Sequence, residues 1–325
     1  MYKRQVRNRS VIASILRKLG TDKKLGIAAE FFGGAHSRSI GFATVSSVSP
    51  GDDQTNPLSQ RPSIMGIWRL GESIHAGRSA ELTLAQPADA FSSPRWDYVI
   101  KRAIGASENA EHVRQIVQFT AAATSVAHPN LVPVLDASAT GAFPYLVMPM
   151  LEGTTMQAHL DGDAKPLPVA LWWVRQICHA LTALHAGGWV HGDVKPENTI
   201  VGPRGHVTLI DLGFATRVHT VYGSQFRGTP EYAAPEVISG NMAAMPSADM
   251  FSLGRVLWKW LTNIEPTSEI VLEPIAELVE SMLDEDPTAR PTAEAVTRKL
   301  LRLEIDTLGL HIGPEGTETP LRRAA

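Results

Sequence analysis

The chain has 325 residues, of which 44% are hydrophobic and 19% charged, so it can bury a sizeable core in one two-lobed domain flanked by tails. Its 30 basic and 33 acidic residues leave a formal net charge of −3, which argues against a globally basic nucleic-acid binder. The single cysteine, Cys178, excludes an internal disulfide framework and a clustered thiolate metal site, and favours a cytoplasmic protein. No apolar run approaches the roughly eighteen residues that cross a bilayer, so we expect no transmembrane segment.

The N-terminal residues 1–24 are strongly basic, with a single acid among them. Apolar residues between Val11 and Leu19 fall on one helical face, which is typical of a short amphipathic helix. We expect a solvated tail, with a weak contact to a membrane surface, a protein or a nucleic acid as the alternative. Residues 33–63 are rich in Gly, Ser and Pro, which indicates a linker, so residues 1–66 are predicted to be a disordered tail.

From Ile67 onward the sequence takes on strand character. Alternating and β-branched residues predict a hairpin followed by three further strands. The predicted strands cover residues 67–74, 80–85, 96–104, 131–135 and 145–150. A helix is expected over residues 110–126, between the third and fourth of these strands. The half of the domain up to residue 150 is therefore predicted to be mainly sheet.

Beyond Leu151 apolar residues recur at helical spacing. The periodic segments cover residues 171–184, 253–261, 272–282 and 296–303. The composition then thins into Gly, Thr, Pro and Arg, which predicts a C-terminal tail over residues 304–325. The fold class is therefore predicted to be α+β, in one domain over residues 67–303 with a small β-rich lobe (67–150) and a larger helical lobe (151–303).

Candidate chemistry concentrates in the sequence H-G-D-V-K-P-E-N at residues 191–198 and in D-L-G at residues 211–213. Phosphoryl transfer needs Mg²⁺ on the phosphates and a carboxylate that orients the attacking hydroxyl. These two stretches offer both functions. Asp193 would accept the hydroxyl proton and Lys195 would steady the γ-phosphate. Asn198 and Asp211 would hold Mg²⁺.

These motifs resemble the Ser/Thr branch of the eukaryotic-type protein kinase family. The D-x-K-P-x-N pattern at residues 193–198 is similar to its catalytic loop, D-L-G stands for its metal motif D-F-G, and A-P-E at residues 234–236 closes its activation segment. The resemblance implies that Thr229 bridges Asp193 and Lys195. It also implies that Arg290 pairs with Glu236, that Asp249 anchors the catalytic-loop backbone, and that His191 is structural.

In the first lobe, Y-V-I-K at residues 98–101 resembles the V-A-I-K strand of the family, which puts Lys101 on the α- and β-phosphates. Residues 145–151 resemble the hinge, with Met148 as gatekeeper. Adenine recognition would then use the Pro149 carbonyl, which proline retains, and the Leu151 amide. The resemblance covers residues 67 to 303 and implies ATP and Mg²⁺ as cofactors and the Ser/Thr hydroxyls of proteins as substrates.

The glycine loop departs from the family pattern. Alignment of the following strand puts His75, Gly77 and Ala80 at the three glycine positions and Leu82 at the valine position. Only one glycine of three remains, although backbone amides must approach phosphate closely there. We therefore expect weak nucleotide affinity.

Two charged positions of the family are also lost. The acid that normally pairs with the strand lysine is Phe119 here, so Lys101 is expected to lack its usual carboxylate, with Gln115, Gln118 and Glu111 as the nearest polar side chains. The arginine that usually precedes the catalytic aspartate, and that pairs with an activation-segment phosphate, is Gly192. Phosphorylation is therefore expected not to be obligatory, although the candidate acceptors are Thr220, Tyr222 and Ser224.

Three functions remain open at this point. The leading one is an active Ser/Thr protein kinase that uses Mg-ATP. The second is a kinase-like binding module, or pseudokinase, whose first lobe has lost efficient nucleotide handling. The third is a small-molecule phosphotransferase, because H-G-D with a later Asn also resembles aminoglycoside and choline kinases, although that family lacks the A-P-E segment.

Overall fold

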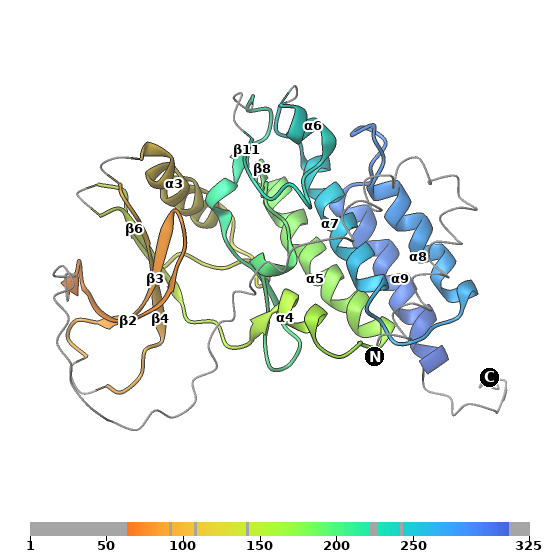
Figure 1. Ribbon diagram of the computed structural model, residues 1–325, viewed down its shortest axis with the longest axis horizontal. Coiled ribbons are helices and arrows are strands. Elements are labelled where there is room, and N and C mark those ends of the chain that lie inside the picture. Colours follow the sequence, from red (N-terminus) through yellow and green to blue (C-terminus); the bar gives the residue numbers. More distant parts are fainter. Residues whose placement is uncertain are drawn as a thin grey trace.

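The computed structural model describes residues 64–90, 93–106, 109–140, 143–221, 226–240 and 243–311, with side chains to residue 308. The predicted basic patch and linker lie outside these residues, as do Tyr222 and Ser224. Figure 1 shows a curled sheet with one helix on the left and a helical lobe on the right. The predicted two-lobed α+β fold is confirmed.

The small lobe is an antiparallel sheet of six strands in the order β1-β2-β3-β4-β6-β5. The strands are β1 (Ile64–Met65), β2 (Trp68–Ala76), β3 (Ala80–Pro87), β4 (Tyr98–Ala103), β5 (Asp136–Ser138) and β6 (Tyr145–Pro149). Helix α3 (Ala110–Ser125) is the helix of this lobe, and Asn109 caps it by accepting a hydrogen bond from the Glu111 N–H. Strand β1 pairs with β2 from Ile64 onward, so the folded domain begins before the predicted residue 67.

The strand predicted over residues 131–135 is wrong. Leu131 forms only an isolated bridge with Leu209, and the paired strand of this region is β5. Pro133 lies inside the predicted strand and has no N–H to donate to a ladder. The chain therefore joins the sheet at Leu135, whose N–H donates to the Val147 carbonyl, and continues as β5.

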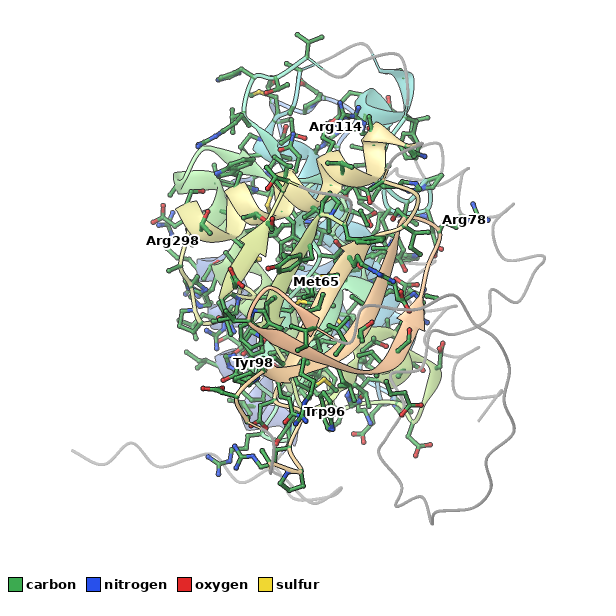
Figure 2. All side chains as sticks on the ribbon, turned by 90° about the vertical axis from the view of Figure 1, so that its left-hand side faces the viewer. Met65, Arg78, Trp96, Tyr98, Arg114 and Arg298 are labelled. Atoms are coloured by element: carbon green, nitrogen blue, oxygen red, sulfur yellow. The ribbon has the colours of Figure 1, made fainter. Side chains whose placement is uncertain are left out.

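Figure 2 looks onto the small lobe from outside, with Met65 near the middle of the sheet. Met65 packs in a small core with Trp68 and Ile100. Arg78, at the tip of the β2–β3 hairpin, is exposed and projects away from the sheet. The hairpin that corresponds to the glycine loop therefore has an apolar base and a solvated tip.

The large lobe is built from α4 (Met156–Asp161), α5 (Leu167–Ala186), α6 (Pro235–Ser239), α7 (Pro246–Leu261), α8 (Glu269–Met282) and α9 (Ala293–His311). Helices α5, α6 and α7 each have proline in the first turn, where its missing N–H has no intrahelical partner to lose. Helix α9 continues beyond the predicted boundary at residue 303. Glu304 is held there by Arg175 at 2.6 and 2.9 Å, and Thr307 is buried.

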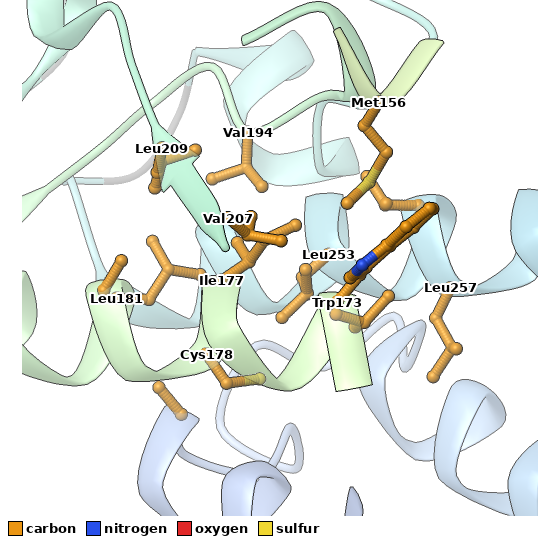
Figure 3. Close-up of a cluster of buried hydrophobic side chains, with 14 of the residues drawn as sticks. Met156, Trp173, Ile177, Cys178, Leu181, Val194, Val207, Leu209, Leu253 and Leu257 are labelled. Atoms are coloured by element: carbon orange, nitrogen blue, oxygen red, sulfur yellow. The ribbon is translucent and has the colours of Figure 1, made fainter. Parts of the chain in front are cut away.

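Figure 3 shows the core of this lobe, where side chains of α5, α7 and β10 (Val207–Leu209) meet. Val194 of the predicted catalytic loop points into the same core and is fully buried. Burying a side chain of this size stabilises a fold by about 1.5–3 kcal/mol, so it also fixes the loop. Cys178 lies on the α5 side of the core, and burial raises the pKa of its thiol to about 12.

Short strands position the loops between the lobes. Strands β7 (Thr154–Thr155) and β9 (Thr199–Val201) pair beside β10, and β8 (Trp189–Val190) pairs with β11 (Thr216–Arg217). The Ile210 N–H donates to the Asn198 carbonyl at 2.8 Å. This register brings the two predicted motifs, which follow β8 and β10, side by side. None of the helices in the described ranges is long and apolar enough to span a bilayer.

Candidate active site

A buried carboxylate holds the backbone of the predicted catalytic loop. Asp249, in the first turn of α7, is 1% exposed and accepts hydrogen bonds from the N–H groups of His191 (2.7 Å) and Gly192 (2.9 Å). Burial alone would raise the pKa of Asp249. The hydrogen bond and charge of His185, whose Nε2 lies 2.9 Å away, with smaller contributions from His191 and Gly192, lower it overall. The anchoring role implied by the resemblance is therefore visible in the geometry.

His191 supports the loop from inside and is fully buried. Its Nδ1 accepts a hydrogen bond from the Asp193 N–H, and its Nε2 lies 3.2 Å from the Ile210 carbonyl, to which it can donate. Both ring nitrogens are therefore used in fixing the two motifs relative to each other. This arrangement agrees with the predicted structural role.

Four polar side chains converge next to the loop. Asp193 is 5% exposed, and its Oδ2 accepts from Lys195 Nζ at 2.8 Å and from Asn198 Nδ2 at 2.9 Å. Lys195 also donates to Thr229 Oγ1 at 2.6 Å. The other oxygen, Asp193 Oδ1, is buried and has no hydrogen-bond partner among the described residues. A buried carboxylate oxygen in this state is an acceptor prepared for a proton or hydroxyl from outside.

Asp211 lies opposite this group in a left-handed backbone conformation, with φ 61° and ψ 72°. Its Oδ1 accepts from the Gly213 N–H at 3.3 Å and from Lys101 Nζ at 2.5 Å. Burial tends to raise the pKa of Asp211, but the charge and hydrogen bond of Lys101 and the Gly213 N–H lower it overall. Asp211 is therefore held as a carboxylate at the boundary between the lobes.

Lys101 lacks the family's usual carboxylate on α3, as expected, but it pairs with Asp211 instead. Helix α3 supplies none, because Phe119 occupies the position of the family's acid, and its ring centroid lies 5.3 Å from Lys101 Nζ. The ring face attracts the ammonium and the Asp211 carboxylate neutralises it. Lys101 is 9% exposed and Phe119 is buried, whereas the Asp211 side chain is 34% exposed, so the contact with the ring is the more shielded of the two.

The other polar residues of α3 have different neighbours. Gln115 packs against the D-L-G turn, since a Cβ added at Gly213 would lie 3.4 Å from the Gln115 Cβ. Glu111 pairs with Arg114 on its own helix and with Arg227, which precedes Gly228 in the activation segment. Sequence reasoning missed Arg227, and no local pattern links it to a residue 116 positions earlier.

The predicted nucleotide-contacting residues lie on the β2–β3 hairpin and at the end of β6. The Gly77 N–H donates to the Ala80 carbonyl at 2.9 Å, and Leu82 pairs with His75 across the hairpin. At the other end, Pro149 has no N–H and the Met150 N–H already donates to the Asp97 carbonyl. Leu151 is therefore the first residue after the strand whose amide is available to donate, and its contact with adenine stays a prediction.

The A-P-E segment is fixed by a buried ion pair. Arg290 Nη1 and Nη2 bind the two Glu236 oxygens at 2.6 and 2.9 Å, and Arg290 Nε donates to the Asp284 carbonyl. The side chain of Arg290 is fully buried, whereas that of Glu236 is 11% exposed. The pairing implied by the resemblance is confirmed, and it ties the end of the activation segment to the loop before α9.

Comparison with known proteins agrees with this geometry. The family profile described as "Protein kinase domain" matches residues 95–273, which is more than half of the chain. The chain therefore belongs to the protein kinase family.

Several curated relatives carry Ser/Thr kinase names. The chain is similar to the serine/threonine-protein kinase PkaA of Streptomyces coelicolor, with 28% identity over 277 residues that cover 75% of this chain and 48% of the relative. The serine/threonine-protein kinase PrkC of Bacillus subtilis is 29% identical over 212 residues, covering 62% of this chain and 31% of the relative. PkaB of Streptomyces coelicolor is 34% identical over 168 residues, covering 48% and 40%. The chain spans less than half of the length of each of these relatives.

Proposed function

We propose that the chain transfers the γ-phosphate of Mg-ATP to Ser or Thr hydroxyls of protein substrates. The observation that carries this proposal is the unpartnered, buried Asp193 Oδ1, held in place by bonds from Lys195 and Asn198 to the other oxygen. A carboxylate fixed in this way can accept a proton from a hydroxyl as the phosphate bond forms. All three relatives described above are named serine/threonine-protein kinases, which supports the choice of acceptor.

The donor set fits a magnesium ion. Asn198 and Asp211 bring an amide oxygen and a carboxylate from two adjoining loops, and hard oxygen ligands of this kind suit Mg²⁺, which keeps its remaining positions for water and phosphate oxygens. Among the described residues there is no cluster of three or more His, Cys, Asp or Glu side chains that could hold a metal on its own. When bound, Mg²⁺ neutralises charge on the phosphates.

The small lobe holds the nucleotide in this proposal. Lys101 binds the α- and β-phosphates, and the hairpin around Gly77, Ala80 and Leu82 covers the phosphates with backbone. The Pro149 carbonyl and the Leu151 amide bind adenine. These roles are carried over from the family motif position by position.

Lys195 and Thr229 complete the large-lobe side. Lys195 bonds both Asp193 and Thr229, so it couples the catalytic loop to the segment that seats the substrate. Its ammonium also steadies the transferred phosphate. A cytoplasmic location and a weak contact of residues 1–24 with a surface or partner stay predictions.

The direct test is transfer from radiolabelled Mg-ATP to a basic, Ser/Thr-rich protein such as myelin basic protein. Positioned proton acceptance contributes about 10² to 10⁴ in rate, so Asp193→Asn should fold, bind nucleotide and lose that factor. Near wild-type transfer by the metal-replete Asp193→Asn protein would contradict the assignment.

Two observations favour a second candidate, a kinase-like binding module. Asp211, which the metal needs, is bonded to Lys101, and only one of the three loop glycines is present. Under this alternative the wild-type protein shows no transfer, and saturating Mg-ATP does not raise its melting temperature. Either a transfer signal or a thermal shift that depends on Lys101 would rule it out.

A further inference from the structure

An ion pair joins the small lobe to the activation segment. Glu111 lies in the first turn of α3, and Arg227 Nε and Nη2 approach its two carboxylate oxygens at 3.3 and 3.4 Å. Arg114, one turn further along the same helix, binds the same carboxylate at 2.6 Å. Figure 2 shows Arg114 on α3 at the top of the small lobe. The Arg227 contact spans the two lobes, whereas the Arg114 contact stays within one helix.

Arg227 is placed where a displacement would reach the catalytic loop. It precedes Gly228, whose φ is +110° and where an added Cβ would lie 2.9 Å from the Gly192 carbonyl and 3.6 Å from Asp193 Oδ1. Thr229, the next residue, accepts the hydrogen bond from Lys195. The backbone that follows Arg227 is therefore packed directly against the catalytic carboxylate.

Residue 192 of the catalytic loop is a glycine, so no side chain at this position can bind the activation segment. Gly192 has φ +80°, and a Cβ there would come within 2.8 Å of the Phe214 carbonyl. No cation can therefore project from this position toward a phosphate on the segment. In this chain the charges are placed the other way round: the anion is Glu111 on α3, and the cation is Arg227 of the activation segment.

The Glu111–Arg227 ion pair is partly shielded from water, so its attraction can contribute to holding the activation segment. The Arg227 side chain is 27% exposed and that of Glu111 is 31% exposed, in contrast to the Arg298–Glu294 pair at 68% and 67%. Pairs that are partly withdrawn from water keep more of their attraction than pairs on an open surface.

We propose that Glu111 and Arg227 form a latch that holds the activation segment against α3 and seats the protein substrate without any phosphate on the segment. The latch rests on the proposed kinase function, and both residues are positioning residues that act through Gly228 and Thr229. The acidic partner in the latch is a residue of the sequence and not an added phosphate, so the seated state does not wait for a modification.

The test uses phosphatase-treated full-length protein whose phosphate-free state is verified by intact mass. In Arg227→Met, kcat/KM for the protein substrate should fall about tenfold, equivalent to about 1.4 kcal/mol, mainly through KM for that substrate, while KM for ATP stays within about twofold. Arg114→Met is the matched control, because it removes an arginine from the same carboxylate without opening the latch. It should stay within about twofold of wild type on every parameter.

Charge reversal separates attraction from packing. Arg227→Glu places two carboxylates together and should lower kcat/KM at least as far as Arg227→Met, and Glu111→Arg should act likewise. The double variant Glu111→Arg with Arg227→Glu restores an opposite pair and should recover about half of the wild-type kcat/KM. A double variant as poor as the worse single variant would overturn the latch.

Hydrogen exchange keeps the latch testable when activity is absent. Amides of residues 226–233 should exchange faster in Arg227→Met than in wild type, with Arg114→Met unchanged. Equal exchange in Arg227→Met and wild type would overturn the latch. Phosphate-free wild type that is inactive until its activation segment is phosphorylated would also overturn it. If no form of the wild-type protein transfers phosphate, the proposed function fails, and the exchange result alone decides whether the latch exists.

Discussion

The candidate site has two walls, one from each lobe, and they are held by different means. On the large-lobe wall, backbone N–H groups of the catalytic loop are bound by the buried Asp249, and Val194 anchors the loop in the core. On the small-lobe wall, Lys101 is held by two side-chain contacts, the Phe119 ring and the Asp211 carboxylate. Backbone anchoring fixes the position of the atoms that would touch the hydroxyl. The small-lobe wall has replaced a family acid and still neutralises its lysine, which shows that charge balance can be met by another partner.

The largest expected effect concerns the frame of the large lobe. Arg290→Met leaves the Glu236 carboxylate largely buried without its cation, and breaking a buried pair lowers the free energy of unfolding by about 3–5 kcal/mol. The matched control is Arg298→Met, which removes an exposed pair of similar length and should lower it by no more than about 0.5 kcal/mol. Urea unfolding followed by tryptophan fluorescence measures both. If both variants lose the same free energy of unfolding, burial of the Arg290–Glu236 pair does not contribute to the stability of the large lobe.

The next largest effect is stabilisation by bound Mg-ATP, which should depend on the small-lobe wall and not on the catalytic aspartate of the large-lobe wall. Mg-ATP at a hundred dissociation constants should stabilise the wild-type protein by about 2.7 kcal/mol. Lys101→Met should abolish the shift in melting temperature, because its ammonium is the phosphate contact of the small lobe. Asp193→Asn, on the opposite wall, should keep the shift because it contacts the hydroxyl and not the nucleotide. A full shift in Lys101→Met, measured by calorimetry, would place nucleotide binding elsewhere.

The anchoring carboxylate also predicts a pH effect. Burial alone would raise the pKa of Asp249, but the hydrogen bond and charge of His185 outweigh burial and lower this pKa in the folded protein. In acid, the unfolded chain therefore binds more protons than the folded one. The stability from this group is present above the ordinary carboxyl pKa of about 3.9 and is lost as the pH falls through the folded value.

Urea midpoints in acid can isolate that contribution. Asp249→Asn has no proton to bind, so its stability should fall less steeply below about pH 4, by up to about 1.4 kcal/mol per pH unit. The same series at pH 7 records the loss from the altered hydrogen bonds alone. Parallel acid slopes for the variant and the wild type would refute this account of Asp249.

The smallest expected effect is a gain of activity. Gln115→Glu places a carboxylate beside the D-L-G turn, where it gives Lys101 a second partner and leaves Asp211 free to bind the metal. The rate of phosphate transfer should therefore rise a few-fold, which is less than the tenfold gain that corresponds to about 1.4 kcal/mol. Gln118→Glu tests the same idea about one turn along the helix. Val117→Glu adds the same charge on an exposed face of α3 and should change nothing. A rise in Val117→Glu equal to that in Gln115→Glu would attribute the gain to net charge.

The large-lobe wall was predictable because its functional residues are close in sequence. Asp193, Lys195 and Asn198 lie within six residues, and Asp211 follows thirteen residues after Asn198, just beyond β10, so local spacing alone indicates a shared site. Four of the six strands of the sheet were predicted, whereas the short strands β1 and β5 were missed, and over residues 131–135 strand propensity was overridden by Pro133.

Long-range contacts were not predictable in the same way. Lys101 and Asp211 are 110 positions apart, and Glu111 and Arg227 are 116 positions apart. Nothing in a single sequence indicates that two such distant residues are in contact, unless the motif pattern of a known family pairs them. Here the family pattern correctly indicated that the usual acid of Lys101 is replaced by Phe119, but it did not point to Asp211 as the partner that takes its place.

The burial of Cys178 has a practical consequence for measuring these ideas. Its thiol is enclosed in the core and its pKa is raised to about 12, so maleimides that attack thiolates at neutral pH should leave the folded protein unlabelled. Cysteines introduced at Val117 on α3 and at Ile238 on α6, both exposed, would then be the reactive sites of the native chain. Dyes at these two positions would report the separation of the lobes by energy transfer without any change to the buried core.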